Sequence, residues 1–117
     1  MSPTSSEVAR HYATFQVQTA SHPKRISMLH VRCVELIMLG RQEDDAAKRR
    51  IFLDKAQNIL SQFQGVLHVD DAVSQGLFFL YDYTYMLLEH GREEDVAHSL
   101  EIMVTLRNTF EELLRSI

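Results

Sequence analysis

Apolar residues recur at helical spacing along four stretches of the chain, and no strand-like alternation persists anywhere in it. These apolar seams predict helices over residues 21–40, 45–65 and 71–90, and a fourth that begins near residue 93 and continues to the C-terminus. The links between the stretches are short, so consecutive helices should be antiparallel neighbours. Together they predict an all-α fold, an antiparallel up-down four-helix bundle over residues 21–117.

Residues suited to capping stand where these helices should begin and end. Ser21 can accept hydrogen bonds from the free backbone N–H groups that open the first helix, and Asp70 or Asp71 can do so for the third. Gly91 is placed to end the third helix and Gly40 to end the first, because helices commonly stop at glycine. The positions of these residues therefore agree with the apolar pattern.

The beginning of the chain has a different character from the rest. Residues 1–10 are small and polar, whereas the next ten carry Tyr12, Phe15 and Val17 in a polar setting. We therefore expect residues 1–20 to be a flexible N-terminal segment, part of which docks on the bundle. The alternative is an arm that makes no contact with the bundle.

The third predicted helix has more apolar surface than a four-helix bundle covers. Between Leu77 and Leu88 only Asp82 and Thr84 are polar. A helix in a small bundle buries a stripe roughly 100° wide, so part of this surface should stay outside and bind a partner. The alternatives are that this helix is the most buried of the four or that it pairs in a homodimer. Its large side chains form three stripes: Phe78, Tyr81, Tyr85 and Leu88; Val73, Leu77, Leu80 and Leu87; and Phe79, Tyr83 and Met86.

Composition narrows the class of protein further. A chain of 117 residues fits one domain, and its net charge of −4 argues against nucleic-acid binding, which needs a basic face. The chain does not begin like a signal peptide, and no apolar run is long enough to span a membrane. A single cysteine, Cys33, fits a reducing compartment. We therefore expect a cytoplasmic protein without membrane insertion.

No group of residues points to catalysis, a metal or a cofactor. The six histidines never stand three or four positions apart on one helix, the spacing that a helical metal site needs. Cys33 falls on a predicted core seam, where a thiol stays protonated and unreactive. The basic run Lys48, Arg49 and Arg50 fits a solvated helix face better than a phosphate site. The sequence therefore predicts a protein that is not an enzyme and has no cofactor.

Five short motifs occur in order along the chain. They are Tyr12 and Val17 before Thr19-Ala20-Ser21, then Met28-Leu29, Lys55-Ala56-Gln57-Asn58-Ile59-Leu60, Leu80-Tyr81-Asp82-Tyr83 and Leu106-Arg107-Asn108-Thr109-Phe110. Through them the chain resembles the FliS family of flagellar export chaperones over about residues 12–115. His30-Val31-Arg32 departs from the family pattern, which often has Tyr-Asp-Gly after Met-Leu, and Pro23 stands one position late.

The resemblance implies a function and the residues that carry it. FliS-type chaperones bind the disordered C-terminal region of flagellin in the cytosol, prevent its premature polymerisation and assist its export, with export gate components as a further partner. The cargo would fold into helices along apolar grooves, and the N-terminal segment would cap an empty groove. The alternative is a helical homodimer, an interaction or regulatory protein that uses the same apolar face. The implied groove residues are Met28, Leu29, Ile59, Leu60, Leu80, Tyr81 and Tyr83, with Tyr12 and Val17 as the cap.

Overall fold

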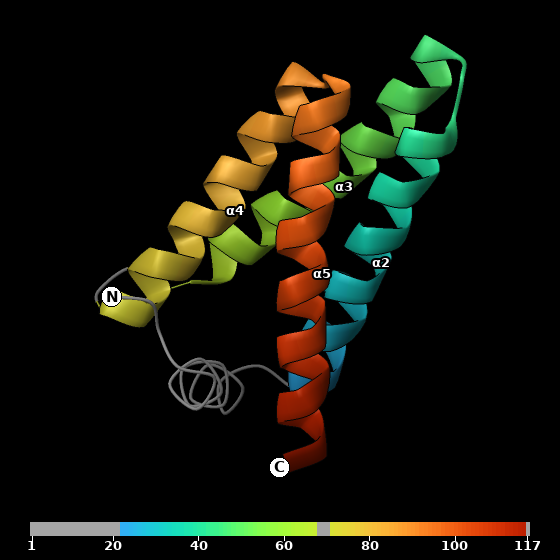
Figure 1. Ribbon diagram of the computed structural model, residues 1–117. Coiled ribbons are helices and arrows are strands. Elements are labelled where there is room, and N and C mark those ends of the chain that lie inside the picture. The colour runs from blue at the N-terminus through green and yellow to red at the C-terminus, as the bar shows by residue number, and fades with distance from the viewer. Residues whose placement is uncertain (1–21, 68–70, 117) are drawn as a thin grey trace.

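The computed structural model describes residues 22–67 and 71–116, and these residues fold into four long helices (Figure 1). This confirms the predicted all-α four-helix bundle. The predicted N-terminal segment, residues 1–20, lies outside the described residues, and so does the proposed cap at Ser21. The helices are α2 (His22–Gln42), α3 (Ala46–Val66), α4 (Ala72–His90) and α5 (Glu93–Ser116).

The four helices form a ring in which each helix packs against two neighbours. α2 and α4 both pack against α3 and α5, and consecutive helices run in opposite directions (Figure 1). Among the described residues, the Cα atoms of α2 and α4 stay more than 8 Å apart, as do those of α3 and α5. The pair α2 and α4 is therefore joined across the bundle by side chains alone.

Two aspartates and a glycine set the ends of α3 and α4, and the sequence points to two of the three, Asp71 and Gly91. The Asp45 carboxylate accepts hydrogen bonds from two backbone N–H groups at the start of α3, at 2.9 and 3.0 Å. Asp71 caps α4 by accepting from the Ser74 backbone N–H at 2.8 Å. Gly91 follows α4 with φ of 70°, in the left-handed region that glycine enters without strain. The second and third predicted helices agree with α3 and α4 to within one residue at each end.

Gly40 has a different role from the one that the sequence suggests. α2 continues past it to Gln42, so the prediction that Gly40 ends the helix is wrong. The residue is buried against α3, where a Cβ atom would lie 2.8 Å from Cδ2 of Leu53. A side chain larger than hydrogen would therefore force the Leu53 side chain or the two helices to shift. Close packing of α2 against α3 explains this glycine.

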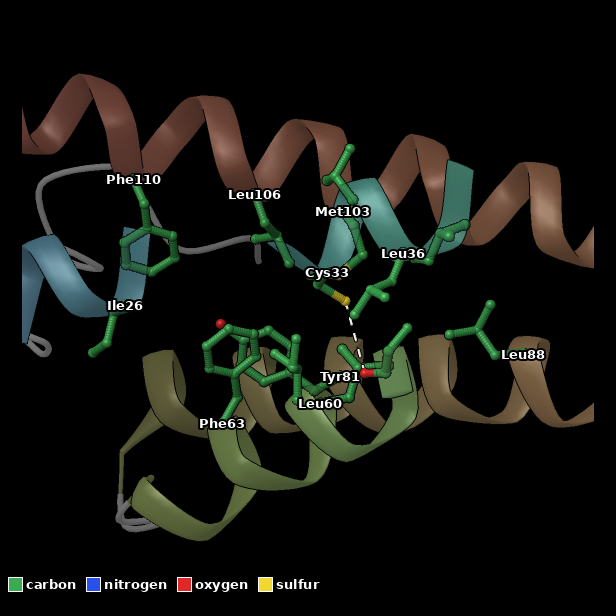
Figure 2. Close-up of a cluster of buried hydrophobic side chains, with 14 of the residues drawn as sticks. Ile26, Cys33, Leu36, Leu60, Phe63, Tyr81, Leu88, Met103, Leu106 and Phe110 are labelled. Carbon is green, nitrogen blue, oxygen red and sulfur yellow. Dashed lines mark hydrogen bonds between the residues drawn. The ribbon is translucent and has the colours of Figure 1, made fainter. Parts of the chain in front are cut away.

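Apolar side chains from all four helices fill the centre of the bundle (Figure 2). Cys33 lies in this core with no exposed surface, and its thiol donates a weak hydrogen bond to the Ala56 carbonyl at 3.8 Å. Burial raises the pKa of the Cys33 thiol to about 12, because a thiolate loses its hydration there. The cysteine is therefore protonated, as its place on the predicted seam indicates.

Candidate partner-binding face

The aromatic rings of α4 divide between the core and the surface. Tyr81 has no exposed area, whereas Phe79 is 65% and Tyr83 37% exposed. Each residue along a helix turns the direction of the side chain by about 100°. The side chains two positions before and after the inward ring of Tyr81 therefore point outward. The 77–88 stretch thus has more apolar circumference than the bundle covers, as the sequence predicts.

Three side chains on the outside of α4 form what we call the outer strip: Phe79, Tyr83 and Met86. Their spacing of four and three residues places them on one helix face, and Met86 is 50% exposed. The rings of Phe79 and Tyr83 stack with centroids 6.2 Å apart, and Tyr83 meets the edge of His98 on α5 at 5.7 Å. The strip is therefore an ordered apolar surface that extends to the border of α5.

On the inner side of α4, Tyr81 makes a hydrogen bond across the bundle to His30 on α2. His30 is fully buried, and its Nδ1 lies 2.8 Å from the Ile26 carbonyl, which can only accept. Nδ1 therefore carries the proton of the neutral imidazole, so Nε2 is an acceptor. The Tyr81 hydroxyl, 3.0 Å from Nε2, donates to it. This bond connects the two helices whose backbones do not meet.

Aromatic rings enclose the His30 imidazole and keep it neutral. Phe63 of α3 and Phe110 of α5 stack on it at centroid distances of 4.2 and 4.5 Å. Phe63 also stacks on Tyr81 at 4.9 Å, and Figure 2 shows Phe63, Tyr81 and Phe110 in the core. Burial lowers the pKa of His30 from 6.5 to about 4, against a smaller opposing effect of the bond to the Ile26 carbonyl. His30 is thus a neutral core residue at pH 7.

A second set of polar contacts holds α3 to the C-terminal half of α4. Arg50 donates to the Leu88 carbonyl at 2.9 Å, and Gln57 donates to the Tyr85 carbonyl at 3.1 Å and to the Glu89 carboxylate at 2.9 Å. Lys48 is exposed as expected, but Arg50 is half-buried, and so is Arg49. The expected solvated basic face is therefore only partly exposed, because Arg49 bonds to the Glu43 carbonyl and Arg50 to the Leu88 carbonyl.

The structure does not gather the seven implied groove residues on one surface. Leu60 and Tyr81 have no exposed area and Ile59 has 7%, so these side chains belong to the core of this conformation. Leu29 and Leu80 are half-buried, while Tyr83 on α4 and Met28 on α2 are exposed, Met28 by 61%. α2 and α4 are not neighbours, so the two exposed residues belong to separate surfaces. The implied cap residues, Tyr12 and Val17, lie outside the described residues.

Two residues of the outer strip are absent from that implied set. Phe79 and Met86 are exposed, yet the motif Leu80-Tyr81-Asp82-Tyr83 directs attention to the residues between them. Their signal in the sequence is the stripe that they form with Tyr83. That stripe lies opposite the buried positions Leu77, Tyr81 and Leu88 on a helical wheel.

The described residues hold neither a cluster of metal-ligating side chains nor a helix able to span a membrane. Within residues 22–67 and 71–116, no three His, Cys, Asp or Glu side chains lie close enough together to hold a metal ion. In the same residues, no helix combines the length and apolar character that a membrane span requires. The surface feature that remains as a candidate site is the outer strip.

Comparison with known proteins assigns the chain to a family. No curated protein matches it significantly. The family model described as "Flagellar protein FliS" matches residues 5–116, which is nearly the whole chain. That range includes all four helices, the outer strip and the His30–Tyr81 pair. The chain belongs to the FliS family of flagellar proteins.

Proposed function

We propose that this protein is a flagellar export chaperone that binds the disordered C-terminal region of flagellin in the cytoplasm. By holding that region it prevents premature polymerisation and keeps flagellin fit for export. The observation that carries the proposal is the outer strip, which exposes Phe79, Tyr83 and Met86 side by side in a chain of the FliS family. Aromatic and methionine side chains suit such a surface, because they bring large apolar area and adapt to a partner's shape.

The spacing of the outer strip suits a helical ligand. Residues four and three apart on α4 present an apolar ridge of two turns, against which an amphipathic helix can pack. Burying one fully exposed side chain of this kind contributes about 1.5–3 kcal/mol, and the three are on average half exposed, so together they contribute roughly 2–5 kcal/mol. Ordering a disordered segment costs about 2–5 kcal/mol or more, so the strip alone leaves a weak net affinity. We infer that further contacts, with Met28 on α2 as a candidate, complete the binding.

The N-terminal segment has a place in this proposal. Tyr12 and Val17 would cover apolar surface while no cargo is bound and leave it when flagellin arrives. Components of the export gate would then receive the loaded chaperone.

The test measures binding of a peptide from the flagellin C-terminal region by isothermal titration calorimetry. Phe79→Ser should weaken binding at least about tenfold, because it removes the most exposed ring of the strip. Ile51→Ser is the matched control, since Ile51 is also an exposed apolar residue, at 53%, but lies on α3. Both variants should keep the melting temperature of the parent, since neither side chain supports the core.

Two results would contradict the proposal. The first is peptide binding that Phe79→Ser leaves unchanged. The second is a stable dimer, seen by light scattering, that ignores the peptide and dissociates in Phe79→Ser. That second result would assign the strip to a homodimer instead.

A further inference from the structure

The outer strip runs between two pairs of exposed carboxylates. On α4 these are Asp82 and Glu89, and on α5 they are Glu94 and Glu101. The members of each pair stand seven residues apart, so each pair lies along one face of its helix over two turns. Acidic borders require a matching charge on a ligand, whereas an apolar strip alone requires only apolar side chains.

Helix geometry and one ring contact place these carboxylates beside the strip. Asp82 stands three residues after Phe79 and four before Met86, and these spacings make helix neighbours. Glu94 and Glu101 stand four residues before and three after His98, whose ring meets that of Tyr83 at 5.7 Å. One acidic pair therefore lies on α4 beside the strip and the other lies across its border with α5.

Few positive charges offset this acidic border. α4 contains no lysine or arginine, and Arg92, between α4 and α5, is ion-paired with Asp95 at 2.8 Å. Residues 71–116 carry three lysines and arginines against nine aspartates and glutamates, whereas residues 22–67 carry eight against five. The α4–α5 half of the bundle is thus strongly negative, while the α2–α3 half is positive.

We propose that the α4–α5 face binds an amphipathic helix whose apolar anchors are bordered by lysine or arginine. This inference rests on the proposed function, because it takes the flagellin segment as the occupant and adds the charge that this segment must carry. Basic side chains at seven-residue spacing would meet Asp82 and Glu89 on one side of the strip and Glu94 and Glu101 on the other, as charged pairs border the seam of a coiled coil. An acidic helix would meet like charges and be rejected.

The experiment compares two designed helical peptides on the full-length protein. Both carry the same apolar anchors; one has lysines beside the anchors and the other has glutamates. The lysine peptide should bind at least about tenfold more tightly at low salt, and the difference should shrink as salt screens the charges. The double variant D82N/E101Q should reduce that preference about threefold to tenfold, as expected for two exposed ion pairs. The control E35Q/D44N removes two exposed carboxylates from α2 and from the link between α2 and α3, and should leave the preference unchanged.

Three outcomes would overturn the inference. One is equal affinity for the two peptides at every salt concentration. Another is a preference that E35Q/D44N lowers as much as D82N/E101Q does. The third is concentration-dependent self-association by light scattering that D82N/E101Q abolishes, which would make the basic α2–α3 half of a second copy the occupant. Failure of the proposed function looks different, because the flagellin peptide would then not bind while the designed lysine peptide still did.

Discussion

Acid should destabilise this protein through His30 well before the imidazole protonates in the native state. The groups around the ring are the Ile26 carbonyl from its own helix, Phe63 from α3, Tyr81 from α4 and Phe110 from α5. A proton on Nε2 would replace the acceptor that the Tyr81 hydroxyl needs and would leave a cation among aromatic rings. The native state therefore resists protonation that the unfolded chain accepts readily.

The size of the effect follows from the two pKa values. His30 has a pKa of about 4 in the folded protein and 6.5 as an unperturbed side chain. Between these values the unfolded chain binds more protons, so the free energy of unfolding falls as the pH falls. The stabilisation is complete above pH 6.5 and is lost progressively towards pH 4; it amounts to about 3 kcal/mol at 1.36 kcal/mol per pKa unit. This is a large fraction of the roughly 5–15 kcal/mol that stabilises a typical domain.

The assay is urea unfolding between pH 4 and pH 7.5 of the parent protein and His30→Gln. Glutamine has no titrating proton but can accept a hydrogen bond from Tyr81, and all other groups titrate in both proteins. The stability difference between the two should therefore change by about 3 kcal/mol across this range, in favour of the variant at low pH. Parallel stability curves would refute the reasoning. An NMR titration of the parent gives a second check, because a His30 midpoint near 6.5 would refute it even if the variant does not fold.

Three further predictions concern the core and the helix packing. Tyr81→Phe should lower the free energy of unfolding by about 1–3 kcal/mol in urea titrations, because the buried imidazole loses its donor. Gly40→Ala should lower the melting temperature, since the added methyl meets Leu53 at 2.8 Å, whereas Gly65→Ala, with nothing within 4 Å, should raise the free energy of unfolding by about 0.5 kcal/mol. Cys33 should react with a thiol reagent at the rate of unfolding and not faster, because the thiol is buried and its pKa is about 12; rapid labelling of the native protein would contradict this.

Features that depend on local chemistry could be predicted from the sequence. Asp71 caps α4 through its side-chain carboxylate and Gly91 through its left-handed backbone, and both act on the adjacent turn, so the bounds of α4 follow from residues within a few positions. The role of Gly40, in contrast, could not be predicted from its neighbours in the sequence. Its neighbours in sequence suggest a helix stop, but its presence is explained by Leu53, thirteen residues away on the facing helix.

The direction in which each ring of α4 points depends on the other three helices. The motif that includes Tyr81 and Tyr83 points to α4 as a helix with a functional role. The motif does not show, however, that the Tyr81 ring is buried while the Tyr83 ring is exposed. Periodicity defines the three apolar stripes of α4 but does not show which of them is buried, since all three are rich in large apolar side chains. The bond between His30 and Tyr81 favours one of them, and the two residues stand fifty-one positions apart, which no local pattern reveals.

The bond between His30 and Tyr81 stabilises the rotation of α4 that leaves the outer strip exposed. Turning α4 about its axis would exchange one apolar stripe for another, so the apolar pattern alone does not fix the rotation. Arg50 bonds to the Leu88 carbonyl and Thr84 bonds within its own helix, whereas Gln57 also bonds to the Glu89 carboxylate, a side chain that this rotation brings next to α3. Any rotation that moves Tyr81 away leaves the imidazole acceptor buried and unpaired, at a cost of about 1–3 kcal/mol. The buried bond, together with the bond between Gln57 and Glu89, thus favours the rotation that leaves the outer strip outside for a partner.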